Sequence, residues 1–291
     1  CSRNTCDGVS DKRGLVAASF SIKVSPPEPL LFTEPFRRAY LDSVHVPLRP
    51  VTLSSSPTTP SPLVSWLVPV FNAPAEWLSD MWTSIEAQSG MGLGSWELVI
   101  VDDHSDSKET LDWLAQLDGL PQVRVVRMEA QRGVGGALNA GWRSCNGEFV
   151  ARLDADDIAE VDRLQRQLAY LASHPSVAIV GGGFRTFRVS SELQASGGGQ
   201  RHRMPCHPLL VRWRMLFSCS LAHPTVTMRK VEVCEEAPYP EGEEAEDHCC
   251  WLNLPLHVQF ANIADVVTNL RRHRGSRSAS AALAIRHSSY G

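Results

Sequence analysis

Two aspartates one residue apart are placed to hold a metal ion. Asp154 and Asp156 come directly after the apolar run EFVARL, and both could reach one hard cation, which prefers oxygen ligands. A divalent ion held there could bridge the phosphates of a nucleotide and neutralise a departing diphosphate. Taken alone, such a tripeptide is more often a solvated loop, and Asp157 could cap a following helix. The position at the end of a buried strand favours the metal-binding interpretation.

A second acidic cluster, VDDHSDSKET, follows another apolar run. One interpretation is a strand-to-helix loop in which Asp106 or Ser107 caps the helix. The other places Asp103 against a nucleobase, where a carboxylate accepts an N–H group and so selects the base. Both can hold, because capping and base contact use different residues.

A glycine-rich segment, QRGVGGALNAGW, has the composition of a phosphate-binding turn before a helix N-terminus. Its closely spaced glycines are Gly133, Gly135 and Gly136. The dinucleotide fingerprint G-x-G-x-x-G requires a glycine at position 138, where this chain has leucine, so that fingerprint fails. Arg132 and Asn139 remain candidate donors to a ligand.

Short apolar runs and helical stripes must position these side chains. The runs predict strands over residues 63–71, 96–101, 123–128, 148–153 and 177–180. Apolar residues at helical spacing predict helices over residues 77–85, 111–117, 137–142 and 161–171. The alternation is typical of an α/β fold with a largely parallel sheet and helices on both faces. Ligands bind beyond the carboxyl ends of such strands, and two strands end in the acidic clusters, so the site is expected there.

Composition excludes several classes of protein. The chain has 291 residues, 43% of them hydrophobic, and 28 Lys and Arg against 32 Asp and Glu give a net charge of −4. This balance gives no footprint for nucleic-acid binding, and no apolar stretch reaches the roughly 18 residues that span a bilayer. The eight cysteines are scattered and are expected to be reduced thiols. The chain begins with Cys1, so it could be a fragment. Two locations stay open: a soluble domain in the cytoplasm, and a domain attached to a membrane through missing segments.

Four segments taken together resemble the nucleotide-sugar half of glycosyltransferase family 2. They are LVSWLVPVFNA, VDDHSDSKET, QRGVGGALNAGW and EFVARLDADDIAEVDRLQRQLAYLASHPSVAIVGG, in the family's order and spacing over about residues 63–183. The resemblance implies the GT-A fold, a Rossmann-like αβα sandwich with a mostly parallel central sheet. It also implies an inverting transferase that uses an activated sugar, usually UDP-linked, with Mn²⁺ or Mg²⁺.

The resemblance assigns roles to residues of the first half. The segment that opens the nucleotide pocket corresponds to Pro69, Phe71 and Asn72. Asp103 corresponds to the acid that contacts uracil. Asp154 and Asp156 correspond to the D-x-D metal pair, with Asp156 as the direct ligand and Asp154 nearer the ribose.

The second half is less regular. HPLLVRWRMLF is expected to form a helix with Leu210, Trp213 and Phe217 inward. LAHPTVTMRK is similar to the family's strand on the acceptor side, with His223 at its mouth. The acidic run ending at Asp247 is by default a solvated loop before a helix, where acids are favourable.

The same run resembles the family's Glu-Asp motif, whose aspartate is the catalytic base. By that resemblance Asp247 is the base and Glu246 lies beside it. Two positions depart from the motif, since Cys250 stands where the family has leucine and Asn253 where it often has arginine. These departures leave the packing of the helix and the acceptor contacts open.

The segment NLRRHRGSRS resembles the family's closing segment. Arg272 and His273 could then pair with the diphosphate, which arginine contacts in a bidentate manner. The alternative for a cationic run in this position is a solvated tail.

These observations predict one GT-A glycosyltransferase domain over residues 63–274, with a nucleotide-sugar half at 63–183 and an acceptor half at 184–274. Residues 1–62 are expected to form a Pro- and Ser-rich, largely irregular extension, and residues 275–291 a flexible tail. The expected reaction moves a hexosyl or N-acetylhexosaminyl group from a UDP-sugar to a carbohydrate, lipid or protein acceptor. A nucleotidyltransferase on a similar sheet and a non-catalytic relative that binds glycans or nucleotides are the alternatives.

Overall fold

The computed structural model describes residues 62–92, 94–189, 199–234, 237–242, 245–255 and 257–273. All of them belong to one compact unit, Ser54–Gly291. The expected N-terminal extension, apart from its last residue, and the expected tail at 275–291 lie outside the described residues. No helix in the described ranges combines the length and apolar character needed to cross a bilayer.

The strands of the described residues form one nine-stranded sheet, whose order is β3-β2-β1-β4-β8-β6-β9-β5 with β7 paired to β6. Their bounds are β1 Val64–Val70, β2 Trp96–Asp102, β3 Val123–Arg127, β4 Phe149–Arg152, β5 Ile158–Ala159, β6 Val177–Phe187, β7 Gln200–His202, β8 Thr227–Arg229 and β9 Gln259–Arg271. β1 is parallel to β2 and β4, β2 to β3, and β6 to β9. The antiparallel ladders of β8, β5 and β7 are short, so most paired residues lie in parallel ladders. The predicted, mostly parallel α/β sheet is confirmed.

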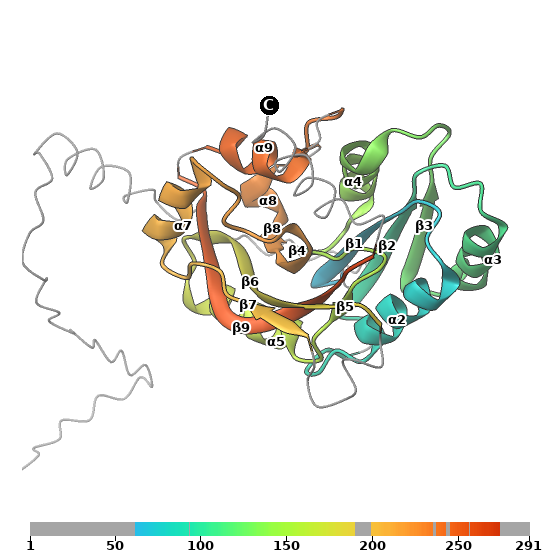
Figure 1. Ribbon diagram of the computed structural model, residues 1–291, viewed down its shortest axis with the longest axis horizontal. Helices are drawn as coiled ribbons and strands as arrows, with labels where there is room; N and C mark the ends of the chain where they lie inside the picture. Colours follow the sequence, from blue (N-terminus) through green and yellow to red (C-terminus); the bar gives the residue numbers. More distant parts are fainter. Residues whose placement is uncertain are drawn as a thin grey trace, which may run out of the picture. The chain divides into compact units, whose positions relative to one another are not determined.

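Helices cover both faces of this sheet (Figure 1). Their bounds are α2 Ala75–Glu86, α3 Lys108–Leu117, α4 Gly133–Ser144, α5 Arg163–Ser173, α7 Pro208–Met215, α8 Lys230–Val233 and α9 Glu246–Asn253, with a short 3₁₀ turn at His223–Thr225. Alternate residues of β1 face opposite sides, as a strand requires. Trp66 packs in the core with α2, α3 and α5, whereas Leu67 packs in the core with α4, α7 and α9. The expected αβα sandwich is therefore confirmed.

Helix α4 lies close to the strands because its contacting residues are small. A Cβ atom on Gly141 would come within 2.3 Å of a Leu67 methyl carbon and 2.6 Å of one on Val101. One on Gly135 would come within 2.8 Å of the carbonyl oxygen of Pro240. These glycines permit close packing, which explains the composition that resembled a phosphate-binding turn.

Helix α7 presents the face opposite to the one expected. The sequence predicted that Leu210, Trp213 and Phe217 point inward, but all three are exposed. Val211 and Met215, four residues apart, are buried instead. Apolar residues occur on every side of this helix, so their spacing does not indicate which side packs against the sheet.

Candidate functional site

A cavity of about 680 Å³ lies where β1, β2 and β4 end. This volume is within the usual range for small-molecule sites. Its walls include these residues singled out from the sequence: Pro69, Phe71, Asn72, Asp103, Asp154, Asp156, His223, Glu246, Asp247, Arg272 and His273. The strand ends thus bring together side chains from both halves of the chain.

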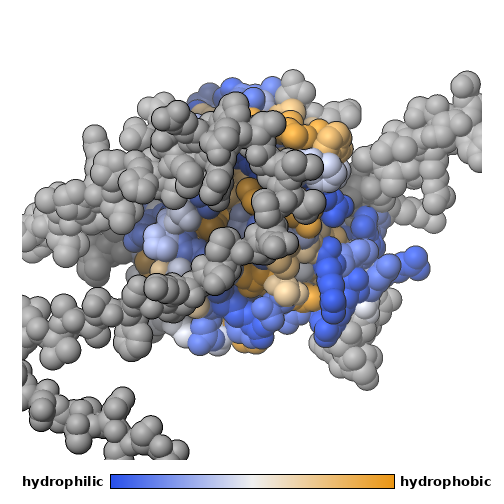
Figure 2. Space-filling view, turned by 90° about the vertical axis from the view of Figure 1, so that its left-hand side faces the viewer, coloured by the Kyte–Doolittle hydropathy of each residue, from blue (hydrophilic) through white to orange (hydrophobic). Residues whose placement is uncertain are grey.

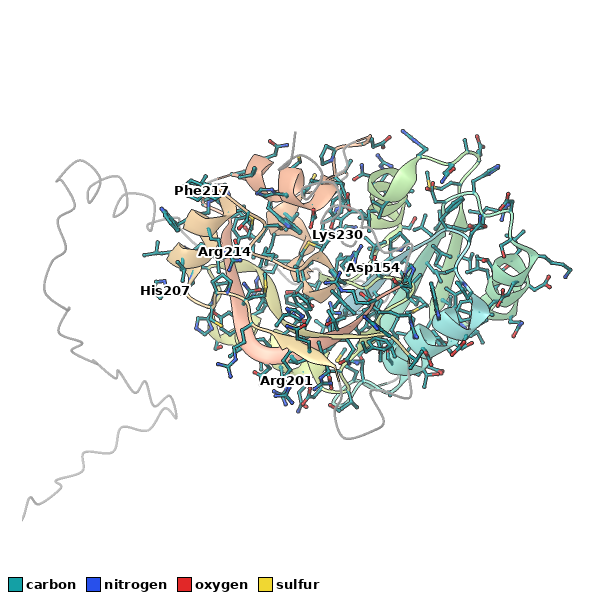
Figure 3. The ribbon with its side chains drawn as sticks, in the orientation of Figure 1. Asp154, Arg201, His207, Arg214, Phe217 and Lys230 are labelled. Atoms are coloured by element: carbon teal, nitrogen blue, oxygen red, sulfur yellow. The ribbon has the colours of Figure 1, made fainter. Side chains whose placement is uncertain are left out.

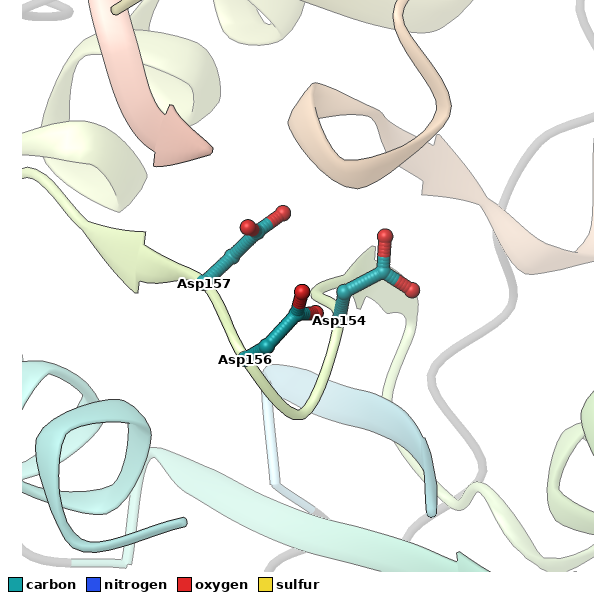
Figure 4. Close-up of side chains that lie close together, drawn as sticks. All are labelled: Asp154, Asp156 and Asp157. Atoms are coloured by element: carbon teal, nitrogen blue, oxygen red, sulfur yellow. The ribbon is translucent and has the colours of Figure 1, made fainter. Parts of the chain in front are cut away.

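Three aspartates meet on one side of the cavity (Figure 4). Asp154, Asp156 and Asp157 each offer a carboxylate oxygen, and these oxygens all lie within 4.8 Å of one another. Asp157 is buried and accepts a hydrogen bond from the backbone N–H of Arg271 at 2.9 Å. It therefore fixes the loop to β9 and does not cap a helix, because α5 begins only at Arg163, after Asp162.

The charges of these aspartates are unfavourable in each other's presence. Burial raises the pKa of Asp156, and the charge of Asp154 raises it further. Burial raises the pKa of Asp157 well above its usual range, and both neighbouring aspartates add to the effect. A divalent cation would offset this repulsion, and an all-oxygen donor set is the kind that Mn²⁺ and Mg²⁺ bind. The residues present therefore fit the expected metal.

A buried arginine lies beside the acidic cluster. Arg152, the last residue of β4, is only 3% exposed and lines the cavity. One terminal nitrogen contacts a carboxylate oxygen of Asp154 at 2.5 Å. Burial lowers the pKa of Arg152, but Asp154 outweighs this effect and the pKa is raised. Among the described residues, its Nε and Nη1 atoms are buried and have no hydrogen-bond partner.

Asp103 forms another wall of the cavity. Its side chain is nearly buried and accepts a hydrogen bond from the backbone N–H of Arg132 at 2.8 Å. Burial raises the pKa of Asp103, whereas the backbone N–H groups of Arg132 and Gly133 lower it. The neighbouring Asp102 has a structural role, because it contacts Arg127 at 2.6 Å and the backbone N–H of Ser105 at 2.9 Å.

The side chain of Asn72 links the loop after β1 to the loop after β2. Asn72 adopts the left-handed conformation with φ of 48°. Its side-chain oxygen accepts from the backbone N–H groups of Asp106 and Ser107, at 3.0 and 2.9 Å. Ser107 caps α3, as predicted, by accepting from the N–H of Thr110. Asn72 therefore joins the two loops that flank the Asp103 side of the cavity.

The opposite side of the cavity carries Glu246 and Asp247, which begin α9. Glu246 is buried, and its carboxylate lies 3.8 Å from Nδ1 of His223. The other ring nitrogen of His223 lies 3.1 Å from the hydroxyl of Tyr239. Asp247 is more accessible; one oxygen accepts from the N–H of His248 at 2.7 Å, and the other lies 3.7 Å from the sulfur of Cys219, whose nearer acceptor is the carbonyl of Leu221 at 3.1 Å.

The end of β9 closes the cavity near the aspartates. Arg271 donates to the carbonyl oxygen of Asp156 at 2.9 Å and contacts Asp80 of α2 at 2.6 Å. His273 lies 3.0 Å from a carboxylate oxygen of Asp156, and its ring packs on Trp77. The basic segment is thus part of the cavity wall as far as His273, while Arg274 lies outside the described residues.

The structure does not bring two of the sequence-predicted residues to the cavity wall. The Asn139 amide donates to the carbonyl of Tyr239 at 2.7 Å and accepts from its N–H at 3.0 Å. Its polar atoms therefore join α4 to that segment, and the expected ligand contact of Asn139 stays a prediction. The side chain of Arg132 pairs with Glu241, and only its backbone supports the site, through Asp103.

The cavity-lining residues that were not identified as site residues from the sequence include Trp77, Arg152 and Arg271. Trp77 was assigned to the apolar stripe of its helix, and Arg271 was only one member of a basic run. Arg152 had a recognisable signal, because a charged residue at the end of a buried strand requires a partner.

Comparisons with known proteins agree with this geometry. Residues 65–236 match the family model described as Glycosyl transferase family 2. The amylovoran biosynthesis glycosyltransferase AmsE of Erwinia amylovora is 28% identical over 188 residues, which cover 64% of this chain and 68% of AmsE. The O-antigen biosynthesis glycosyltransferase WbnJ of Escherichia coli is 25% identical over 202 residues, covering 68% of this chain and 76% of WbnJ.

Solved structures show the same fold. S. aureus TarS in complex with UDP-GlcNAc superposes with a TM-score of 0.59 at 21% identity, over 75% of this chain and 60% of that chain. The mannosyltransferase PcManGT from Pyrobaculum calidifontis, in complex with GDP-Man and Mn²⁺, superposes with a TM-score of 0.56 at 19% identity, over 86% of this chain and 71% of that one. At these identities the likeness concerns the fold alone.

Proposed function

Because the chain belongs to glycosyltransferase family 2 and has the GT-A fold, we propose that it transfers a sugar from a UDP-sugar to an acceptor hydroxyl with inversion. One observation carries the proposal. A single cavity at the strand ends is lined by Asp103, by the aspartate cluster and by Asp247. A base-binding acid, a metal-binding pair and a candidate general base are thus combined in one site.

The donor nucleotide occupies the side of the cavity formed by β1 and β2. The carboxylate of Asp103 accepts an N–H group of the base, and the exposed ring of Phe71 offers a surface for it. Arg152 and Arg272, which both line the cavity, supply positive charge to the diphosphate.

Asp154 and Asp156 would hold the metal, because Asp157 is committed to β9. A bound Mn²⁺ or Mg²⁺ supplies charge neutralisation for the departing diphosphate. His273 contacts the same carboxylate of Asp156 that would take part in this site, so it keeps that side chain oriented toward the cavity.

Asp247 acts as the base that removes the proton of the acceptor hydroxyl. The oxygen forms a bond to the anomeric carbon, the bond from that carbon to the diphosphate breaks, and UDP leaves on the opposite side. One displacement of this kind inverts the configuration through an oxocarbenium-like transition state. The N–H of His248 holds the Asp247 carboxylate in place, and the sulfur of Cys219 lies 3.7 Å from it.

Glu246 has a positioning role for Asp247. Its carboxylate is buried next to His223, which is itself held by Tyr239. This chain of contacts fixes the first turn of α9 and hence the direction of Asp247. His223 lines the cavity on the acceptor side.

The relatives support a UDP-linked hexose or N-acetylhexosamine as donor. TarS was solved with UDP-GlcNAc. A second E. coli relative, 24% identical over 60% of this chain, is named UDP-Gal:alpha-D-GlcNAc-diphosphoundecaprenol beta-1,3-galactosyltransferase. PcManGT was solved with GDP-Man, so GDP-sugars are the alternative donors to test beside UDP-sugars.

The decisive experiment measures nucleotide release from a panel of UDP- and GDP-sugars with Mn²⁺. We expect release of free UDP, whether by transfer to an added acceptor or by slow hydrolysis. Release of pyrophosphate instead would indicate a nucleotidyltransferase. Calorimetric binding of UDP without any turnover, with every acceptor class tried, would indicate a non-catalytic relative.

A further inference from the structure

An apolar surface on α7 and the residues after it has no role in the proposed catalysis. It consists of Leu209, Leu210, Trp213, Leu216 and Phe217, and is called the α7 surface below. Trp213 is 62% exposed and Phe217 is 72% exposed. Their rings lie 5.2 Å apart, so they form a pair on the surface rather than part of the core. Exposed apolar clusters of this kind mark interaction sites.

The chain segment that contains α7 is basic, although the whole chain carries a net charge of −4; Arg201 in this segment lies at the lower edge of the view in Figure 3, away from Phe217. Residues 199–222 contain four arginines and two histidines but no Asp or Glu. Arg201, Arg203 and Arg214 are exposed, whereas Arg212 donates to the carbonyl of Val258 and lies over Phe260. Figure 3 places His207, Arg214 and Phe217 on the side of the molecule that carries α7, and Figure 2 looks onto this side, where hydrophobic and hydrophilic residues adjoin.

We propose that the α7 surface docks onto an anionic lipid bilayer. Trp and Phe side chains insert at the boundary between headgroups and acyl chains, and arginine extends its charge to the phosphates of the headgroups. Each arginine near an anionic membrane adds to the attraction. A second copy of the chain fits less well, because a two-fold contact would bring the same arginines against one another.

The α7 surface adjoins the part of the cavity that contains Asp247. His248 of α9 donates from Nε2 to the carbonyl of Met215 at 2.7 Å, at the end of α7. The sulfur of Cys219, two residues after Phe217, lies 3.7 Å from a carboxylate oxygen of Asp247. A bilayer bound here would present membrane-borne hydroxyl acceptors to Asp247. This consequence rests on the proposed function, whereas docking to the bilayer does not depend on it.

Vesicle co-sedimentation tests the proposal on the full chain. We expect binding to phosphatidylcholine vesicles that contain phosphatidylglycerol, weakened by salt, and little binding to pure phosphatidylcholine. The double variant Trp213→Ser/Phe217→Ser and the triple variant Arg201→Gln/Arg203→Gln/Arg214→Gln should each lower the partition coefficient about tenfold or more. Matched controls are Val161→Ser/Leu120→Ser and Arg124→Gln/Arg143→Gln, which remove exposed apolar and basic side chains elsewhere and should leave binding unchanged.

Three results would overturn the proposal. The first is equal binding of wild type and both α7-surface variants. The second is a dimer in light scattering that the double variant converts to a monomer, without vesicle binding. The third is a combination of two observations: wild type does not bind vesicles, and the double variant has a lower melting temperature than wild type. Another part of the chain would then cover the surface. UDP binding by calorimetry in the same variants should stay unchanged, so loss of docking and loss of the proposed activity are separable.

Discussion

Arg152 is a buried guanidinium in which two nitrogens have no partner in the part of the chain that the structure describes. Arg152 contacts Asp154 through one nitrogen and lines the cavity that we propose binds a nucleotide diphosphate. Lysine at this position keeps a charge but loses the fork of donors. We therefore expect Arg152→Lys to weaken UDP binding roughly tenfold and Arg152→Gln roughly a hundredfold, measured by calorimetry. Arg143→Gln on the exposed side of α4 is the control, and wild-type affinity in Arg152→Lys would refute this role.

Asp247 is the base in the proposed reaction. Replacing its carboxylate by an amide in Asp247→Asn removes the proton acceptor but keeps the shape of the side chain. We expect transfer to fall ~10²–10⁴-fold, the usual contribution of a general base, with UDP affinity unchanged. Asp118→Asn, at an exposed acid after α3, serves as the control. Transfer near the wild-type rate would mean that another group is the base.

Replacing Asp156 should weaken the Mn²⁺-dependent binding of UDP, a step that precedes transfer. In Asp156→Asn the cavity loses a carboxylate that we propose holds the metal and that contacts His273. We expect UDP binding to lose its dependence on Mn²⁺, in calorimetric titrations with and without the ion. If the Mn²⁺ dependence persists at wild-type strength, Asp156 does not hold the metal.

For single residues, the sequence predicts a site role where a polar side chain directly follows a buried strand. Asp103, Asp154 and Asp156 are local signals, because each follows an apolar run. Arg271 could not be found this way. Its importance comes from Asp80 and from the Asp156 loop, and both are distant in the sequence.

At the scale of elements, the fit of α4 against the sheet can be tested directly. Gly141→Val places three carbons where buried methyl groups of Leu67 and Val101 already lie. Overpacking of this kind costs typically ~1–3 kcal/mol, so we expect the free energy of unfolding in urea to fall by about that amount. Gly92→Val, where a Cβ would meet nothing within 4 Å, should change stability little. Equal effects of the two substitutions would show that α4 can move away from the strands.

The strands and helices of the first half were predictable because each has a clear hydrophobic period. The predicted strand at 96–101 and helix at 111–117 correspond to β2 and α3. Strand β9 was not predicted. Polar residues interrupt it, and it owes its conformation to pairing with β6, as when Val180 pairs with Ala261. The predicted inward face of α7 was wrong for a related reason, because only packing in the folded core selects Val211 and Met215 as the buried residues.

At the scale of the whole molecule, ligand binding should stabilise the fold only when metal and nucleotide are present together. A ligand at a hundred times its Kd stabilises by about 2.7 kcal/mol, which for a domain of this size raises the Tm by about 5–10 °C. We expect this shift with UDP and Mn²⁺, and expect EDTA to abolish it without unfolding the protein, because the core is complete without the ion. Thermal unfolding followed by circular dichroism measures both. An undiminished UDP shift in EDTA would show that donor binding needs no metal.

Strand β9 also has a consequence for biosynthesis. It pairs along β6 and ends at Arg271, next to the aspartates, so the cavity wall extends from Pro69 to His273. A ribosome-bound nascent chain that has released β6 but not β9 exposes the edge of β6 that β9 covers in the finished protein. Open edges of this kind recruit other chains, and pairing over such a sequence separation is slow. We expect the growing polypeptide to need chaperone protection in this interval, and to complete the wall of the cavity only when β9 emerges.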